Sequence, residues 1–267
     1  MPKLSANLSW LFTELPLRER FAAAAAAGFR AVEMLFPYEL AAPEFAALLR
    51  ANDLELVLMN LPPGDPAKGE RGFAARPGDE SRFTDALETA LAYATACGCP
   101  RLHAMSGMLV DGVPLAQHES ALVANLTNAA PHCAEKGVTL LIEPLNAKDN
   151  PGYVLQSNAQ AIAILDRIAA PNVALQLDLY HTFHTEGRVI ERAHELRGRF
   201  AHVQFAGCPD RREPDRGELD ITRALAQLDA DGYTGWAGLE YRPRTSTEAG
   251  LAWAAPYLGA SRGDVRR

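Results

Sequence analysis

Four polar side chains that could bind a metal ion end four otherwise apolar, strand-like runs of the chain: Glu143, Asp178, Gln204 and Glu240. Their spacings are roughly 35, 26 and 36 residues, and each is about the length of one strand-plus-helix unit. In a barrel of parallel strands the C-terminal strand ends share one face, so we expect these side chains to converge there. The simpler alternative is that each one faces solvent or caps a neighbouring helix.

The residue types at these positions favour a metal site. Three carboxylates brought to one point repel one another, and some of them would be held protonated. A divalent cation removes this conflict, and an oxygen-rich site with open positions suits Mg²⁺ or Mn²⁺. We therefore predict one divalent metal ion, with Mg²⁺ or Mn²⁺ as the candidates.

Three further residues are candidates for binding a substrate. His181 lies three residues after Asp178, where its imidazole could reach a substrate oxygen or, alternatively, bond to the backbone. Arg211 lies in the loop beyond Gln204, and arginine binds carboxylates through two parallel hydrogen bonds, so it indicates an anionic substrate. Arg71 could serve the same purpose from the long loop 60–78, whose glycines would allow it to move as a lid.

The elements that must position these residues alternate strictly along the chain. The predicted strands cover residues 3–8, 31–35, 54–60, 101–105, 139–143, 173–178, 201–206 and 236–240. Predicted helices lie between them at 17–27, 43–51, 80–96, 118–136, 157–168, 189–196, 221–230 and 247–257. Eight strands and eight helices in this order predict an α/β fold, a (β/α)₈ TIM barrel. We expect one domain over residues 1–260 and a disordered C-terminal tail over 261–267.

Composition excludes several classes of function. The net charge of −7 and the absence of a basic run argue against nucleic-acid binding. No apolar stretch is long enough to span a membrane, and no secretory signal is evident. The four cysteines fit reduced thiols in a cytoplasmic protein. No Gly-x-Gly-x-x-Gly follows the first strand, so no nucleotide cofactor is expected. A homo-oligomer is compatible with the sequence.

The chain resembles the hydroxypyruvate isomerase family of the xylose-isomerase-like barrel superfamily. The resemblance rests on segments that run in order along nearly the whole chain: 6–14, 31–38, 60–65, 69–72, 142–146, 176–181, 202–206, 211–218 and 238–241. The chain departs from the family pattern at two positions. The family more often has histidine in place of Arg212 and an acidic residue in place of Gly207. These departures concern contacts to the substrate and leave the expected metal centre unchanged.

The resemblance implies both a site and a reaction. It implies a divalent metal held by Glu143, Asp178, Gln204 and Glu240, with Glu143 and Glu240 also acting as acid and base. The expected substrate is a small anionic hydroxy-keto acid whose oxygens and carboxylate are held by His181 and Arg211. The expected reaction converts hydroxypyruvate to 2-hydroxy-3-oxopropanoate through an enediolate.

Four other functions stay open at this point. The first is a 2-oxo-tetronate isomerase, which acts on a substrate one carbon longer. The second is a ketose 3-epimerase, although such enzymes usually carry histidine in place of Gln204. The third is a DNA-repair endonuclease, which needs more zinc-binding histidines and a basic face. The fourth is a non-catalytic binding barrel, which would not need all four ligand-type residues.

Overall fold

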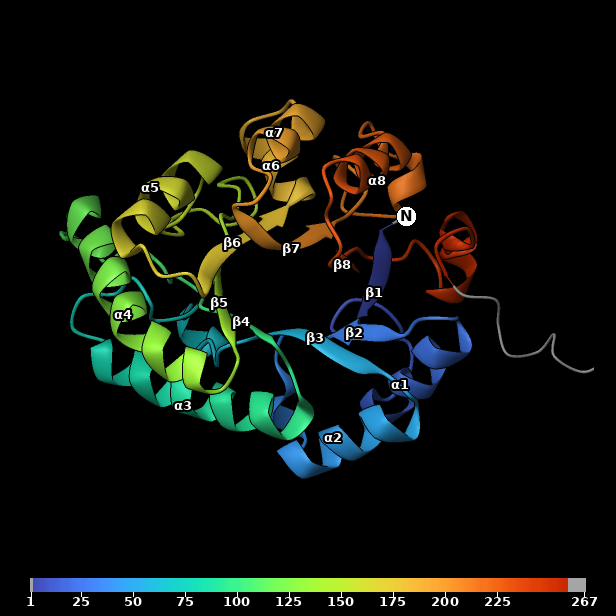
Figure 1. Cartoon of the computed structure of the whole chain (residues 1–267), viewed down its shortest axis with the longest axis horizontal. Coiled ribbons are helices and arrows are strands. Elements are labelled where there is room, and N and C mark those ends of the chain that lie inside the picture. The colour runs from blue at the N-terminus through green and yellow to red at the C-terminus, as the bar shows by residue number, and fades with distance from the viewer. Residues whose placement is uncertain (1, 259–267) are drawn as a thin grey trace, which may run out of the picture.

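The computed structural model describes residues 2–258 and shows a closed barrel of eight parallel strands (Figure 1). Neighbouring strands pair in chain order, and the last strand pairs with the first. The strands are β1 (Lys3–Asn7), β2 (Ala31–Glu33), β3 (Glu55–Asn60), β4 (Arg101–His103), β5 (Thr139–Ile142), β6 (Val173–Asp178), β7 (Phe200–Phe205) and β8 (Trp236–Leu239). The predicted (β/α)₈ barrel is therefore confirmed. The predicted tail at 261–267 lies outside the described residues.

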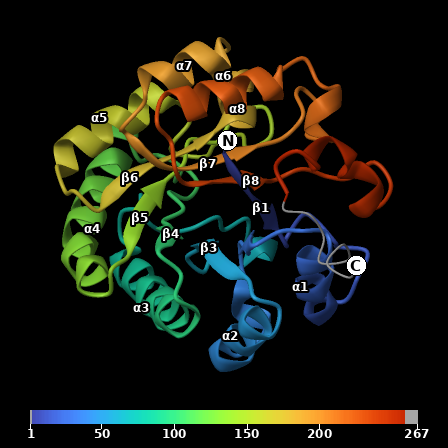
Figure 2. The same ribbon diagram turned by 45° about the vertical axis from the view of Figure 1, so that its right-hand side comes forward.

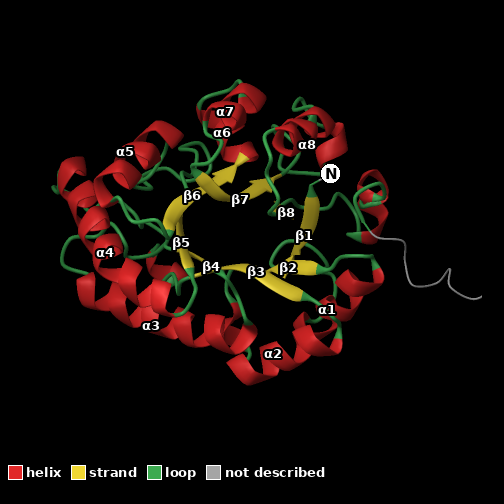
Figure 3. Cartoon of the chain, in the orientation of Figure 1, coloured by secondary structure: helices red, strands yellow, loops and turns green. Residues whose placement is uncertain are grey.

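Helices surround the barrel as an outer ring (Figures 2 and 3). They are α1 (Leu17–Ala26), α2 (Ala42–Ala51), α3 (Glu80–Cys97), α4 (Leu115–Glu135), α5 (Asn158–Ile168), α6 (Leu179–Thr185), α7 (Val189–Glu195) and α8 (Ile221–Ala230). Because this outer ring covers the barrel, most strand residues are buried on both faces, and the strands read as nearly continuous apolar runs. Within the described part of the chain, no helix combines the length and the hydropathy needed to cross a bilayer.

Two helices differ from the prediction. The short helix α6 was not predicted; it begins because Asp178 caps it, with Oδ1 accepting hydrogen bonds from the backbone N–H groups of Tyr180 (2.6 Å) and His181 (3.2 Å). The helix predicted over 247–257 was wrong, since this segment forms two short 3₁₀ turns, Glu248–Gly250 and Ala252–Ala254.

Tertiary hydrogen bonds explain the missing last helix. Thr247 donates its backbone N–H to Glu14 at 2.8 Å, and its hydroxyl oxygen accepts the backbone N–H of Phe12 at 2.5 Å. These bonds tie the start of the segment to the loop after β1, more than 230 residues earlier in the chain. The segment therefore follows the barrel rim, and its helical pattern is overridden by contacts that sequence periodicity does not contain.

Candidate active site

The four strand-end residues lie together at the C-terminal end of the barrel. Asp178 is in register with Gln204, and Gln204 is in register with Gly238 on β8, two residues before Glu240. Glu143 directly follows β5, and Glu240 directly follows β8. All four side chains are buried. The strand register therefore places these side chains at the same end of the barrel, as predicted.

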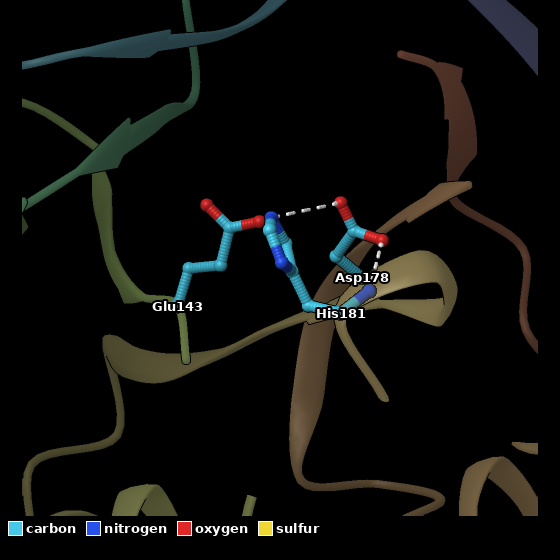
Figure 4. A group of neighbouring side chains, drawn as sticks. All are labelled: Glu143, Asp178 and His181. Atoms are coloured by element: carbon cyan, nitrogen blue, oxygen red, sulfur yellow. Dashed lines mark hydrogen bonds and ion pairs between the residues drawn. The ribbon is translucent and has the colours of Figure 1, made fainter. Parts of the chain in front are cut away.

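Glu143, Asp178 and His181 form a group that could hold a metal ion (Figure 4). Each offers one ligand atom, and these atoms lie within 4.8 Å of one another. Oε1 of Glu143 and Oδ2 of Asp178 are buried and have no hydrogen-bond partner among the described residues. Buried carboxylate oxygens without a partner are costly, and a divalent cation satisfies them. The two carboxylates of this group thus fit the predicted ion, whereas the other two predicted ligands, Gln204 and Glu240, are not part of the group.

Arg211 lies among the same carboxylates. Its Nη2 is 3.1 Å from Oε1 of Glu240 and 3.9 Å from Oδ2 of Asp178. Its guanidinium carbon lies 4.5 Å from the ring centre of Trp10 and 4.8 Å from that of Tyr180. Two aromatic faces and two carboxylates thus fix the guanidinium of Arg211 beside Glu240 and Asp178. Its predicted contact with a substrate stays a prediction.

Two of the crowded carboxyl groups have raised pKa values. Burial, reinforced by the charges of Glu240 and Asp178, raises the pKa of Glu143 well above its ordinary value. Burial also raises the pKa of Glu240 to about 8, although Arg211 acts in the opposite direction. Two neighbouring buried carboxyl groups with raised pKa values can hold a proton and give it up, as general acid–base chemistry requires.

Gln204 is held by two side-chain contacts. Its Nε2 donates to Oε2 of Glu33 at 2.7 Å, and its Oε1 accepts from Nε2 of Gln176 at 2.5 Å. The amide is therefore oriented by Glu33 on one side and by Gln176 on the other. Its oxygen keeps one lone pair free, so its role as a metal ligand stays a prediction.

Glu33 is a central residue that sequence reasoning missed. It is fully buried at the end of β2, and its carboxylate accepts hydrogen bonds from Ser5 (3.0 Å), Asn7 (3.2 Å), Gln204 (2.7 Å) and His202 (2.6 Å). These donors come from β1 and β7, so Glu33 joins three strands across the barrel. The predicted strand continued to residue 35, so Glu33 lay inside an apolar run and not at its end; a lone acidic residue within that run was the available signal.

His181 presents a hydrogen-bond donor to the site. Its Nδ1 accepts the backbone N–H of Asn146 at 3.1 Å, so the proton of a neutral ring lies on Nε2. Burial lowers the pKa of His181 to about 4, which keeps the ring neutral at physiological pH. Nε2 lies 3.8 Å from Oδ2 of Asp178. An N–H at this place fits the predicted contact to a substrate oxygen better than it fits metal ligation.

His103 is a second buried residue that sequence reasoning passed over. It ends β4, and its Nδ1 lies 3.5 Å from Oε2 of Glu143. Burial lowers the pKa of His103 to about 3, with a further contribution from His181. Two histidines thus flank the carboxylate of Glu143 as neutral groups.

Arg71, predicted to bind the substrate from loop 60–78, is bonded to another loop in the structure. Its exposed side chain donates from Nη1 to Oδ1 of Asn150 at 2.5 Å. This bond joins the loop after β3 to the loop after β5 at the rim of the barrel. The predicted contact between Arg71 and the substrate stays a prediction.

The contact between Glu33 and Gly238 provides a test of the buried network. A Cβ added at Gly238 would overlap the Glu33 carboxylate. We expect Gly238→Ala to lower the free energy of unfolding by about 1–3 kcal/mol, as overpacking does, measured by urea denaturation. In a Glu33→Ala background the same substitution should cost much less, because the overlapping atoms are gone. Equal costs in both backgrounds would contradict the assignment.

The buried state of His103 predicts a pH dependence of stability. The unfolded chain protonates His103 near its ordinary pKa of 6.5, whereas the folded chain does so only near 3, so stability is lost as the pH falls from 6.5 toward 3. Relative to His103→Asn, the wild type should lose about 2 kcal/mol of unfolding free energy between pH 7 and pH 5. Exposed His132→Asn controls for the loss of a histidine as such. If the difference in unfolding free energy between the wild type and His103→Asn does not change with pH, this account is refuted.

Comparisons with known proteins agree with the fold. Residues 21–257 match the family model described as "Xylose isomerase-like TIM barrel". A 2-oxo-tetronate isomerase from Cupriavidus necator is 46% identical, with 97% of this chain and 100% of that protein covered. Hydroxypyruvate isomerase from Escherichia coli is 40% identical, with 96% and 100% covered.

Solved structures show the same barrel. A Brucella melitensis structure titled as a family 2 AP endonuclease is 46% identical, has a TM-score of 0.95, and is matched over 97% of this chain and 100% of that chain. D-psicose 3-epimerase from Clostridium cellulolyticum is 16% identical with a TM-score of 0.76, over 94% and 90%, and shows the fold alone. The chain therefore belongs to the xylose isomerase-like TIM barrel family and, with its hydroxypyruvate and 2-oxo-tetronate isomerase relatives, is an isomerase.

Proposed function

We propose that this isomerase interconverts a short 2-oxo hydroxy acid and its isomer by moving a proton between C2 and C3 through an enediolate. The observation that carries the proposal is the burial of Glu143 and Glu240, two carboxyl groups with raised pKa values, in the same group of side chains as Arg211 and His181. Hydroxypyruvate and 2-oxo-tetronate share this C2–C3 chemistry, and both names occur among the relatives.

A divalent ion, Mg²⁺ or Mn²⁺, fits this site. Glu143, Asp178 and Glu240 would hold it, with Gln204 as the neutral fourth ligand. The unpartnered oxygens of Glu143 and Asp178 support the first two of these ligands. When bound, such an ion polarises the substrate oxygens and stabilises the negative charge of the enediolate.

The side chains of the chain supply the proton transfers and the orientation. One of the two glutamates removes the proton from carbon, and the other handles the second transfer. Nε2–H of His181 donates to a substrate oxygen, and Arg211 pairs with the substrate's negative charge. The rings of Trp10 and Tyr180, which stack on Arg211, would keep this cation in place when the substrate enters.

The remaining alternatives are less well supported. At 16% identity, the 3-epimerase structure shares only its fold with this chain. In addition, Gln204 stands where such enzymes usually have histidine. A nuclease is disfavoured by the net charge of −7 of this chain and by its metal-compatible group, which contains a single histidine among residues 2–258. The four cysteines are unpaired, as fits the cytoplasmic location we propose.

Removing one acid–base group should abolish turnover. Glu240→Gln keeps the shape of the side chain but cannot take up a proton, so isomerisation should fall by a factor of about 10²–10⁴. NMR in D₂O with hydroxypyruvate and a 2-oxo-tetronate would follow both product formation and deuterium incorporation next to the carbonyl. Near-wild-type exchange in a folded variant would rule out the assignment. Exposed Glu55→Gln, at the opposite end of the barrel, is the matched control.

Metal removal tests the second part of the proposal. Elemental analysis of the purified protein should find about one divalent ion per chain. Exhaustive chelation should remove both ion and activity, and Mg²⁺ or Mn²⁺ should restore activity. Full activity after complete chelation would exclude a metal role.

A further inference from the structure

Three buried polar side chains lie at the C-terminal end of β3 and β4, on a part of the rim that the proposed mechanism does not use. They are Asn60, His103 and Ser106, and each is at least 96% buried. Oδ1 of Asn60, both ring nitrogens of His103 and Oγ of Ser106 have no hydrogen-bond partner among residues 2–258. Buried polar atoms without partners are rare and cost about 1–3 kcal/mol each, so these four atoms are available to bond to a ligand.

Strand pairing holds these residues next to the proposed chemistry. Asn60 and His103 are register partners on neighbouring strands, and Nδ1 of His103 lies 3.5 Å from Oε2 of Glu143. The backbone of Asn60 accepts the hydroxyl of Tyr38 at 2.6 Å, and the backbone N–H of Ser106 donates to the hydroxyl of Tyr153 at 2.8 Å. These bonds fix the backbone under the unpartnered groups, as a preorganised binding site requires.

The chemistry of these three side chains suits a hydroxyl group. Asn60 and Ser106 are uncharged, and each can both donate and accept a hydrogen bond, as a hydroxyl does. None of the three is an arginine or lysine that would pair with a substrate carboxylate. A substrate carboxylate is therefore directed toward Arg211, which follows β7 on the opposite side of the ring from β3 and β4 (Figure 1).

We propose that Asn60, His103 and Ser106 bind the terminal hydroxyl of a four-carbon substrate and so select 2-oxo-tetronate over hydroxypyruvate. This inference rests on the proposed function. With C1 near Arg211 and the reacting carbons between Glu143 and Glu240, a C4 hydroxyl extends past Glu143 toward His103. Hydroxypyruvate has no C4 hydroxyl and leaves the polar atoms of Asn60, His103 and Ser106 unpaired. A site built to hydrogen-bond a substrate hydroxyl discriminates strongly against an analogue that lacks it.

The test compares kcat/KM for the two substrates in the wild type, Asn60→Leu and Ser106→Ala. The wild type should prefer 2-oxo-tetronate. Each variant should lower kcat/KM for 2-oxo-tetronate about tenfold or more, while kcat/KM for hydroxypyruvate changes by less than about threefold. Ser106→Ala removes a single oxygen and guards against misfolding of the larger change. Asn172→Ala, at the opposite end of the barrel, loses hydrogen bonds to Ala130 and Val138 and should leave the ratio unchanged.

Two outcomes would overturn the proposal. One is an equal loss on both substrates, which would mean that these residues act through Glu143. The other is a wild type with no preference for the longer substrate.

Failure of the proposed function is separable from failure of this inference. If neither substrate turns over, calorimetric binding of two unreactive hydroxy acids, four-carbon erythronate and three-carbon glycerate, replaces turnover. If the wild type binds erythronate more tightly than glycerate and Asn60→Leu loses this preference, the proposed binding of the C4 hydroxyl is supported without turnover. Equal affinities for the two acids in the wild type, or an unchanged preference in Asn60→Leu, refute it.

Discussion

The structure depends on the concentration of negative charge at one end of the barrel. Glu33, Glu143, Asp178 and Glu240 are all buried there, and an isolated buried carboxylate is strongly disfavoured. The chain meets this constraint differently for each group. Glu33 accepts four hydrogen bonds, Asp178 caps a helix, and Glu240 pairs with Arg211. Glu143 has the least compensation and lies at the centre of the proposed chemistry.

Parallel strands make this concentration of charge achievable. Each strand end contributes one side chain to the same rim, so groups that are far apart in sequence meet without long loops. Glu33 spans the barrel to reach Gln204 and His202 on β7, and the glycine at position 238 leaves room for its carboxylate. A fixed network of this kind keeps the pocket in one geometry, which acid–base catalysis needs at its reacting carbons.

The two sides of the pocket have different electrostatic characters. On the β6–β8 side, Arg211 and its aromatic neighbours present a fixed positive charge. On the β3–β4 side, neutral polar groups face the carboxylate of Glu143. A short hydroxy-keto acid has the matching asymmetry, with a carboxylate at one end and hydroxyl groups along the rest of the molecule. This complementarity would orient the proposed substrate along one direction across the barrel.

Sequence alone determined the features that depend on local pattern. The alternation of eight strands with helices predicted the barrel, and the polar residues that end apolar runs predicted which end of which strand carries the site. Both follow from period and spacing, which are properties of the chain before it folds. The segment at 211–218 likewise identified Arg211, because a loop after a strand end must lie at the rim.

Only the tertiary structure decided which groups pair with which. Glu33 bonds to partners as far as 171 residues away, and Thr247 bonds to a loop more than 230 residues away. The same long-range contacts replaced the expected last helix with 3₁₀ turns and joined Arg71 to Asn150. His103 became significant only when β4 was placed beside β5, which brought its ring to Glu143. Hydrogen bonds across a barrel depend on where distant strands meet, and that information is absent from any single segment of the sequence.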